Sequence, residues 1–451
     1  MSSQTLDSSA SLEADLLVIG AGMTGLTAAA WASTAGARVV LVEKGQAVGG
    51  SAMYAGYVWT ADSYERMREV NPGGDAALAR VVIDGIEPGL EWIRSLGVEV
   101  KPPVVVLGYG RGCETDLAGY LAACLAAVRR DGTVLTQART DHLLADGHGV
   151  HGAVVHHDGA ELTIHSRCTL LATGGVAGDP DLRARHIGPL ARTLPLRANR
   201  NSTGDGLRLG LAAGGTFAGE HAGFYGHLVP SGVAYEEPTE FVSLTFYHSE
   251  HGILLNLDGS RFCDETLGDH LNTLAVFDQR EARALLICDE RVHRQWMLTP
   301  YVEGAEAPDK FRLAYNRGAR AAIAGDIDEL EALPEEWGYP GPAARDTLLA
   351  FNQQTAGGVP QPGRKLDCTP LLDPPYYVIE VIPAITNTWG GLRIDAQARV
   401  LHADGTPIPG LLAAGGDAGG LYQRAYGGGL AAGLTFGLRA AQTALPAGAR
   451  T

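Results

Sequence analysis

The sequence predicts an α/β fold in which one domain is interrupted by a second one. A strand pattern at 16–19 leads through closely spaced glycines into an Ala-rich helix ending near residue 35, and a second strand follows at 38–42. Together these segments form a β-α-β unit. The same alternation returns at 411–417 and in a Gly/Ala-rich helix after Gly427, so both ends of the chain are expected to build one Rossmann-like domain.

The middle of the chain has a different pattern. Residues 222–379 are more polar, contain prolines and include several helical stretches, which predicts a separate α+β lobe. We therefore expect 1–221 and 380–451 to form the interrupted domain and 222–379 to form the domain that caps it.

Further elements are expected within the first part of the interrupted domain. Apolar residues recur at helical spacing over 62–99, and another helix is expected at 117–128. Short strands with glycine breaks follow, which predicts a β-meander inserted into the α/β core. These strands are expected at 134–138, 143–145, 150–155 and 162–164, before a separate strand at 169–171.

Composition excludes several classes of protein. The chain has 451 residues, of which 45% are hydrophobic and 19% charged, so a disordered chain is not expected. A net charge of −16 disfavours nucleic acid or an anionic membrane as a partner. No stretch approaches 18 uncharged apolar residues, so no membrane span is predicted. The 6 cysteines are scattered without a C-x-x-C pair, which indicates a reduced, cytoplasmic chain without haem or iron–sulfur ligands.

Closely spaced glycines follow the first strand and predict a dinucleotide site. Gly20 allows a tight turn, Gly22 lets a pyrophosphate approach the backbone, and Gly25 lets helix and strand pack closely. The helix that follows directs its N–H groups and positive dipole end toward the phosphates. Glu43 ends the second strand, where its carboxylate can accept hydrogen bonds from ribose hydroxyls and disfavours the 2′-phosphate of NADP.

Three further glycine clusters favour FAD over NAD. They lie at 49–51, 172–175 and 414–417, and so come from both ends of the chain. A cofactor contacted by both ends must be long and extended, as FAD is, and Asp417 is a candidate for binding its ribityl hydroxyls.

These motifs resemble the fumarate reductase/succinate dehydrogenase flavoprotein superfamily nearly from end to end. The matching segments are GAGMTG, VEKG, GGSAMYAG, ATGG, NRNSTGDGLRLGLAAGG, LDGSRFCDE, TWGGLRIDAQARVL and PIPGLLAAGGDAGG with YGGGLAAGLTFGLRAA. The resemblance implies a Rossmann-like FAD-binding domain of glutathione reductase type, and no histidine stands near Gly50 and Ser51 for covalent attachment, so non-covalent FAD is expected. The expected cofactor-binding residues are Gly20, Gly22, Met23, Thr24, Gly25, Glu43, Lys44, Gly49, Gly50, Ser51, Ala172, Thr173, Gly174, Asp205, Gly416, Asp417, Gly429 and Leu430.

The chain departs from the fumarate-type reductases at residues that handle a dicarboxylate. The position of their proton-donating arginine corresponds to Asp269, and that of their carboxylate-binding histidine to Asn387. A further arginine of those reductases corresponds to Ala425, with Arg424 one position away. Recognition of two carboxylates needs several cationic side chains, so fumarate is disfavoured as a substrate.

Tyr426 and the glycines after it resemble the soluble 3-ketosteroid dehydrogenases instead, which carry a tyrosine before a Gly-rich turn facing the flavin. Such a tyrosine can remove the proton α to a ketone while hydride leaves the β carbon for flavin N5. A free tyrosine is a poor base with a pKa of ~10, but the positive end of the following helix favours the phenolate. The backbone N–H of Gly428 or Gly429 is expected to stabilise the enolate oxygen, although the 4,5-dehydrogenases have a serine in place of Gly428.

We therefore expect an FAD-dependent dehydrogenase that desaturates the α,β bond of a cyclic or steroid-like ketone and passes electrons to an external acceptor. The expected catalytic residues are Tyr426, Gly428, Tyr247 and His227, and the expected substrate-lining residues are Tyr54, Trp59, Asn387, Trp389 and Arg424. An enoate reductase working in the reverse direction and a non-catalytic flavin sensor remain alternatives. The histidines His142, His148, His151, His156, His157 and His165 alternate along strands and turns without paired ligand spacing, so no metal site is predicted.

Overall fold

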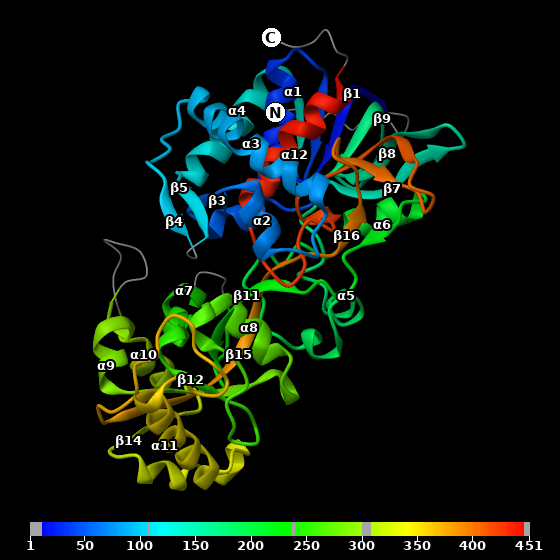
Figure 1. Ribbon diagram of the computed structural model, residues 1–451. Helices are drawn as coiled ribbons and strands as arrows, with labels where there is room; N and C mark the ends of the chain where they lie inside the picture. The colour runs from blue at the N-terminus through cyan, green and yellow to red at the C-terminus, as the bar shows by residue number, and fades with distance from the viewer. Residues whose placement is uncertain (1–10, 107–108, 237–239, 300–307, 446–451) are drawn as a thin grey trace. The chain divides into compact units, whose positions relative to one another are not determined.

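The computed structural model describes residues 11–106, 109–236, 240–299 and 308–445. The chain divides into two compact units. Unit 1 consists of Met1–Pro189, Ala198–Gly223 and Asn387–Thr451, and unit 2 consists of Leu190–Arg197 and Phe224–Thr386. Each unit is built on its own sheet (Figure 1).

The central sheet of unit 1 is mainly parallel, in the order β17-β18-β9-β1-β2-β6. Its strands are β1 (Ser11–Ile19), β2 (Val39–Val42), β6 (Thr133–Leu135), β9 (Ala160–Leu171), β17 (Arg399–Leu401) and β18 (Pro407–Ala413). β1 pairs in parallel with both β2 and β9, and β18 pairs in parallel with β9. The apolar runs Leu16–Ile19 and Val39–Val42 are buried, as expected of strands covered on both faces.

Helices complete unit 1. They are α1 (Met23–Thr34), α2 (Tyr64–Val70), α3 (Ala76–Ser95), α4 (Leu117–Asp131), α5 (Pro180–His186), α6 (Asp205–Ala212) and α12 (Gly429–Ala444), with the short helices η1 (Gly50–Tyr54) and η9 (Gly415–Asp417). The short helix η2 (Pro189–Arg192) begins at the last residue of the first segment of unit 1 and continues into unit 2. α1 packs against α4 and α12, and α12 also contacts α3 (Figure 1). The helix expected over 62–99 is interrupted, because Pro72 and two glycines separate α2 from α3.

Smaller sheets extend unit 1. β7 (Arg139–Asp146) and β8 (Gly149–His157) join β9 in an antiparallel meander. β3 (Tyr57–Ala61), β4 (Val104–Val106) and β5 (Gly110–Glu114) form a three-stranded antiparallel sheet. β10 (Phe217–Ala218), β16 (Gly391–Arg393) and β19 (Ala418–Gly419) form another small sheet.

Two strand predictions in this region are wrong. The segment expected at 134–138 is not part of the meander: β6 follows α4 and pairs in parallel with β2, which makes it a strand of the central sheet. The strands expected at 162–164 and 169–171 are one strand, β9. Its first half pairs with β8 and its second half continues beside β1, so one strand carries the chain from the meander into the central sheet.

Unit 2 is built on a five-stranded antiparallel sheet in the order β11-β15-β13-β12, with β14 also paired to β15. Its strands are β11 (Phe224–Pro230), β12 (Ile253–Leu255), β13 (Ala284–Cys288), β14 (Ala321–Ala324) and β15 (Tyr376–Thr388). Its helices are α7 (Glu240–Leu244), α8 (Asp269–Phe277), α9 (Glu290–Val292), α10 (Lys310–Asn316) and α11 (Gly341–Gly357), with short helices η3 (Tyr247–His251), η4 (Glu265–Leu267), η5 (Arg280–Ala282), η6 (His293–Met297), η7 (Asp328–Ala332) and η8 (Glu335–Trp337). A buried apolar cluster between this sheet and its helices forms the core of unit 2.

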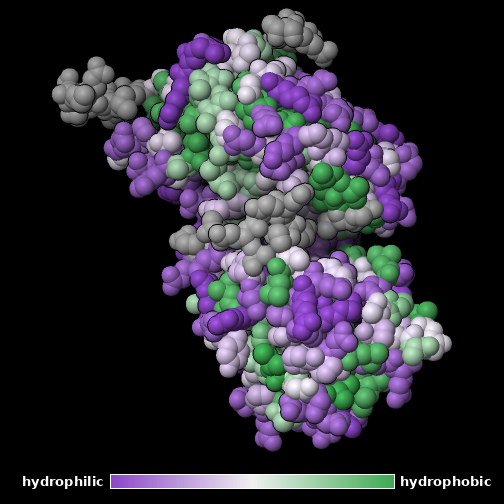
Figure 2. All heavy atoms as spheres, turned by 90° about the vertical axis from the view of Figure 1, so that its left-hand side faces the viewer, coloured by the Kyte–Doolittle hydropathy of each residue, from purple (hydrophilic) through white to green (hydrophobic). Residues whose placement is uncertain are grey.

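The surface shown in Figure 2 carries hydrophobic residues in small groups among hydrophilic ones. Within the described ranges, no helix has the length and hydrophobicity that a membrane crossing requires.

Candidate active site

The turn between β1 and α1 has the close packing that a dinucleotide-binding turn requires. A Cβ at Gly25 would lie 1.8 Å from the carbonyl oxygen of Gly20, so helix and strand can approach only without a side chain here. At Gly22 the situation is different, because a Cβ would meet no protein atom nearer than the Gly49 oxygen at 4.0 Å. The space beside Gly22 is thus left open on the side where a pyrophosphate would approach the backbone, at the start of α1 with Met23 and Thr24 in its first turn.

Glu43 lies at the mouth of the same turn. Its Oε2 accepts the Ala21 N–H at 2.9 Å and its Oε1 accepts the Gly45 N–H at 2.7 Å. These bonds fix the carboxylate at the carboxyl end of β2, and each oxygen retains a second lone pair for a ribose hydroxyl. The geometry therefore fits the ribose-binding role expected from the sequence.

The neighbouring Lys44 joins the first and second segments of unit 1. Its ammonium group contacts Asp205 Oδ2 at 2.5 Å and Thr203 Oγ1 at 2.7 Å. Burial alone would raise the pKa of Asp205, but its bonds to Lys44 and Arg208 hold that pKa below its ordinary value. Asp205 is thus an ion-paired residue at the first position of α6.

A second predicted glycine turn, at 49–51, adjoins the first one. Gly49 donates its N–H to the Ala21 oxygen at 2.8 Å, and a Cβ at Gly50 would lie 3.4 Å from Gly22 Cα. Ser51, in η1, accepts a hydrogen bond from the Asn199 N–H at 3.0 Å. The 49–51 turn therefore lies beside the open space at Gly22.

The turn at Ala172–Gly174 is held by Asp417. The buried carboxylate accepts hydrogen bonds from the Thr173 N–H at 2.5 Å, the Thr173 hydroxyl at 2.9 Å and the Gly175 N–H at 3.0 Å. Burial raises the pKa of Asp417, and these three bonds oppose that shift. A Cβ at Gly416 would lie 2.6 Å from Gly174, so the two turns are in direct contact. Asp417 thus orients the turn, a role that the sequence did not indicate.

The predicted catalytic tyrosine is tied to the N-terminus of α12. The Gly429 N–H donates a hydrogen bond to the Tyr426 hydroxyl oxygen at 2.6 Å, and Tyr426 is 7% exposed. Gly429 and Leu430 form the first turn of this 16-residue helix. The first N–H group of a helix carries part of its positive dipole, and donation into the phenol oxygen stabilises the phenolate form. The backbone N–H groups of Gly428 and Gly429 were the two expected donors to the substrate oxygen, but the Gly429 N–H is hydrogen-bonded to Tyr426.

Two tyrosines that the sequence did not single out hold the Tyr426 turn. The Tyr109 hydroxyl donates to the backbone oxygen of Tyr426 at 2.5 Å, and the Tyr422 hydroxyl donates to the backbone oxygen of Gly428 at 3.1 Å. Burial raises the pKa of both phenols, so both remain protonated donors. The Gly428 turn is also closely packed, since a Cβ there would lie 1.7 Å from the Trp59 oxygen.

Aromatic rings surround Tyr426. Trp59 lies edge-on to it with ring centroids 5.4 Å apart, and the Trp389 ring is nearly parallel to it at 6.5 Å. Asn387 Nδ2 would lie 3.2 Å from a Cβ at Gly429, so this side chain also adjoins the start of α12. The structure thus brings together three of the predicted substrate-lining residues. The other two, Tyr54 on η1 and Arg424 before the turn, are exposed.

The remaining predicted catalytic residues belong to unit 2. His227 on β11 is buried, and its Nδ1 lies 2.5 Å from Asp269 Oδ2 at the start of α8. The ring of Tyr247 lies edge-on to His227 at 5.1 Å, and the Lys310 ammonium group lies 4.7 Å from the Tyr247 ring centre. In the sequence, Asp269 was noted only because it stands at the position of an arginine in the fumarate-type reductases. No nearby sequence pattern predicts its contact with His227.

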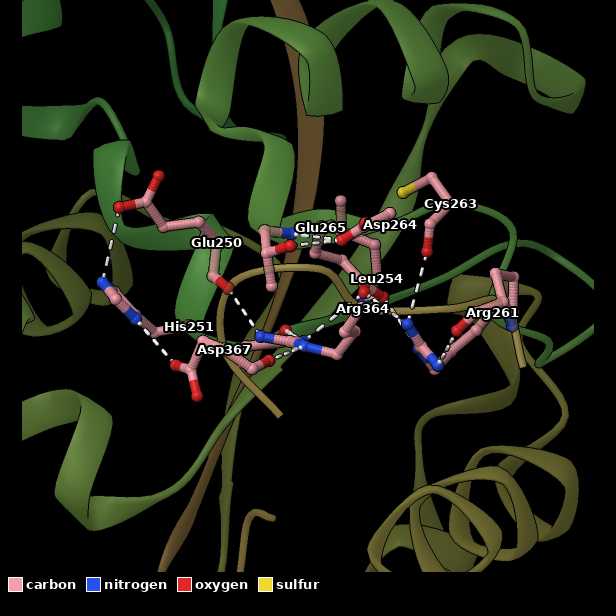
Figure 3. A network of polar contacts seen from close by, with 12 residues as sticks. Glu250, His251, Leu254, Arg261, Cys263, Asp264, Glu265, Arg364 and Asp367 are labelled. Atoms are coloured by element: carbon pink, nitrogen blue, oxygen red, sulfur yellow. Dashed lines mark hydrogen bonds and ion pairs between the residues drawn. The ribbon is translucent and has the colours of Figure 1, made fainter. Parts of the chain in front are cut away.

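A buried ionic network supports the segment that leads into α8 (Figure 3). Glu265 accepts bonds from Arg261 Nε at 2.9 Å and Nη2 at 2.5 Å, and Arg364 Nη1 lies 3.4 Å from Glu265 Oε2. All three side chains are at most 2% exposed. Arg364 also donates to the backbone oxygens of Gly252 and Glu250, each at 2.7 Å, so the network joins three separate segments of unit 2.

A family model described as an FAD binding domain matches residues 114–434, more than half of the chain, and another described as FAD dependent oxidoreductase matches residues 15–176. The chain belongs to the FAD-binding domain family. The predicted cofactor, enzyme class and fold class are confirmed: this family member binds FAD and is an FAD-dependent oxidoreductase with the flavoprotein fold. Among the described residues, no group of three or more His, Cys, Asp or Glu side chains is placed to hold a metal ion.

Relatives of this family member include both reductases and dehydrogenases. The vinyl phenol reductase of Lactiplantibacillus plantarum is 27% identical, covering 92% of this chain and 91% of that protein. The fumarate reductase (cytochrome) of Shewanella frigidimarina is 27% identical over 95% of this chain and 76% of its own, which confirms the superfamily resemblance. The 4-oxocyclohexanecarboxylate 2-dehydrogenase of Sinomonas cyclohexanicum is 26% identical, covering 94% of this chain and 90% of that protein.

A solved structure shows the same fold. The 3-ketosteroid-delta4-(5alpha)-dehydrogenase from Rhodococcus jostii RHA1 has a TM-score of 0.78 and 22% identity, covering 100% of this chain and 99% of that chain.

Proposed function

We propose that this flavoprotein desaturates the α,β C–C bond of a cyclic ketone, with Tyr426 as the base that removes the α proton. The observation that carries the proposal is the 2.6 Å hydrogen bond from the Gly429 N–H to the Tyr426 hydroxyl oxygen. It places the phenol at the positive end of α12 and lowers the cost of forming a phenolate. FAD, when bound, supplies the acceptor for the hydride that leaves the β carbon.

The residues around Tyr426 suit this role. Hydrogen bonds from Tyr109 and Tyr422 hold the backbone of the 426–428 turn, so the phenol oxygen has a defined position. Trp59 and Trp389 supply flat apolar surfaces that fit a ring substrate and exclude water from the proton transfer. The backbone of Gly428 remains a candidate donor to the ketone oxygen.

Arg424 limits the substrate class further. It is exposed immediately before the Tyr426 turn, and a single arginine suits a substrate with one carboxylate. The relationship to a dehydrogenase named for 4-oxocyclohexanecarboxylate supports a ring ketone that carries one carboxylate.

The test is the Tyr426→Phe variant. It should retain FAD, because the flavin contacts expected here do not use the phenol oxygen, but turnover should fall by at least about tenfold, or ~1.4 kcal/mol in the barrier. The measurement is anaerobic loss of the visible flavin absorbance on mixing with cyclohexanone, 4-oxocyclohexanecarboxylate or 4-androstene-3,17-dione. An unchanged rate in this variant would remove Tyr426 as the base.

The second candidate function is an enoate reductase working in the opposite direction. The relationship to vinyl phenol reductase and to fumarate reductase over nine-tenths of the chain favours it. The same anaerobic mixing separates the two functions: a dehydrogenase is reduced by ketones, whereas a reductase that has first been reduced chemically is reoxidised by enoates.

A further inference from the structure

A buried asparagine of unit 1 holds the segment that leads into the Tyr426 turn. Asn71, at the C-terminal end of α2, is 1% exposed. Its amide nitrogen donates to the Leu421 backbone oxygen at 2.8 Å, and its amide oxygen accepts the Gln423 N–H at 2.8 Å. Both the nitrogen and the oxygen of one side chain are therefore bonded to backbone atoms that lie 350 and 352 residues further along the chain.

Other parts of the α2 region contact the same segment. The Asp75 N–H, beyond the turn that follows α2, donates to the Gly420 oxygen at 2.8 Å. Met67, on α2, is fully buried, and a Cβ at Gly427 would lie 2.7 Å from its Cε. The α2 region therefore supports the segment from its start to the turn that contains the proposed base.

The segment needs such support because its backbone is strained. Arg424 has a φ of 60°, in the left-handed region that residues with a side chain rarely adopt and that persists only where the surrounding structure imposes it. The Asn71 amide fixes the N–H of Gln423, directly before this residue. The Arg424 N–H itself donates to the Ala222 oxygen at 2.9 Å. Loss of the Asn71 bonds would let the strain relax, and Tyr426 lies only two residues beyond Arg424.

We propose that Asn71 is a positioning residue for the Tyr426 base: by fixing the segment before it, the amide keeps the phenol oxygen within reach of the Gly429 N–H. That hydrogen bond is 2.6 Å long and stabilises the phenolate. A small movement of the segment would lengthen it, because the phenol moves with the backbone of Tyr426 whereas Gly429 belongs to α12. The effect on turnover rests on the proposed function, but the effect on the phenol does not.

The first variant is Asn71→Ala, which removes both bonds. We expect the folded, FAD-loaded variant to lose about tenfold in kcat with little change in KM, because two hydrogen bonds that hold the base are lost and no substrate contact is removed. A residue with a purely structural role would lower the unfolding temperature and leave the kcat of the folded enzyme unchanged. Turnover is therefore measured well below the unfolding temperature of the variant.

The second variant, Asn71→Asp, can be rescued by acid. A protonated carboxyl group has the shape of the amide, so it can donate to the Leu421 oxygen and accept the Gln423 N–H. The ionised carboxylate can only accept, and it would face the Leu421 oxygen without a proton between them. Burial raises the pKa of such a carboxyl group above its ordinary ~3.9. We expect the kcat of the variant to be within about threefold of the wild type at about pH 5, and to fall to about one-tenth of it by about pH 9.

Two charged side chains near this position act on the introduced carboxyl group in opposite directions. Arg68 donates to the Asn71 and Pro72 backbone oxygens at 3.5 and 2.9 Å, so its positive charge favours the carboxylate. Asp75, whose carboxylate accepts the Leu78 N–H at 3.0 Å, disfavours it. The pH at which kcat falls is set by these charges and by burial, whereas the direction of the change is set by the two bonds.

The matched control is Asn352→Asp in unit 2. The Asn352 amide makes the same pair of bonds, donating to the Leu371 oxygen at 2.7 Å and accepting the Leu371 N–H at 2.8 Å. Because these bonds hold a different segment, the kcat of Asn352→Asp relative to the wild type should not change with pH. If the ratio for Asn71→Asp is equally constant over the same range, the proposed positioning role is wrong.

A measurement without substrate tests the effect on the phenol directly. Carbon NMR of protein labelled at tyrosine Cζ follows ionisation of the phenol, with the Tyr426 signal assigned from its loss in Tyr426→Phe. In Asn71→Ala the phenol should lose its proton at a pH about one unit higher than in the wild type, which corresponds to the tenfold effect on kcat. An unchanged titration of Tyr426 would overturn the inference. If instead no ketone reduces the wild-type flavin, the proposed function fails, while this titration still decides the role of Asn71.

Discussion

Tyr109 illustrates how a single distant hydroxyl can hold the reacting tyrosine. It lies 317 residues before Tyr426 in the chain, and its hydroxyl donates to the Tyr426 backbone oxygen at 2.5 Å. Tyr109→Phe removes this bond and keeps the ring that packs against Trp59. Because one hydrogen bond contributes about 1 kcal/mol, we expect kcat to fall by about fivefold with FAD content unchanged. Turnover and flavin content of the purified variant are the measurements.

The exposed Tyr315 provides the control for this prediction, because it is 58% exposed and Tyr315→Phe should change neither quantity. If Tyr109→Phe and Tyr315→Phe behave alike, Tyr109 does not position the base.

Single residues were predictable from the sequence where they stand beside a backbone motif. Glu43 and Tyr426 adjoin a strand end and a glycine turn, so their surroundings could be inferred locally. Tyr109, Tyr422 and Asp269 act through contacts set by the tertiary fold, and no local pattern distinguishes them from packed aromatic or capping residues. The bonds of Asp417 to the Thr173 turn had no local signal either, because they exist only once two distant strands pair in the central sheet.

The elements of unit 2 that carry the histidine–aspartate pair depend on the network in Figure 3. Glu265 is fully buried and accepts bonds from Arg261 and from the Leu254 N–H, while Arg364 lies beside it. Glu265→Gln would leave two buried guanidinium groups without a carboxylate. We expect it to lower the free energy of unfolding by about 3–5 kcal/mol, measured by urea denaturation.

The control for this prediction is Glu281→Gln. Glu281 is 58% exposed and pairs with Arg283, so this variant should change the free energy of unfolding little. Equal midpoints for the two variants would show that the buried network does not hold this part of unit 2.

Element prediction succeeded where periodicity was long and failed at short strands. The helices around 23–34 and 117–131 have extended apolar patterns and lie where they were expected. β6 has three residues, so its sequence could not reveal that it pairs with β2 after a helical crossover. In β9, one strand was predicted to end at 164 and another to begin at 169, yet the backbone continues as a single strand because His165, Ser166 and Cys168 also pair with the neighbouring strand β1.

At the scale of the whole molecule, the FAD site that we expect in unit 1 draws on all three of its chain segments. Gly22 and Glu43 lie in the first segment, Asp205 in the second and Asp417 in the third. Because a ligand that binds only the folded state stabilises everything that must fold to form its site, FAD should stabilise unit 1 as a whole.

Gly22→Val tests this linkage. A Cβ at Gly22 would meet no protein atom nearer than 4.0 Å, and the backbone there is extended, with a φ of −84°, so we expect the FAD-free protein to unfold at nearly the wild-type temperature. The added methyl groups would occupy the space where the pyrophosphate approaches, so the rise in melting temperature on adding FAD should be lost. For the wild type, FAD at 100 times its Kd should contribute about 2.7 kcal/mol. Gly147→Val, at an exposed turn with open space around it, should keep the full rise. Calorimetry with and without FAD measures the melting temperatures of the wild type and both variants. If FAD raises the melting temperature of Gly22→Val as much as that of the wild type, the pyrophosphate does not bind beside Gly22.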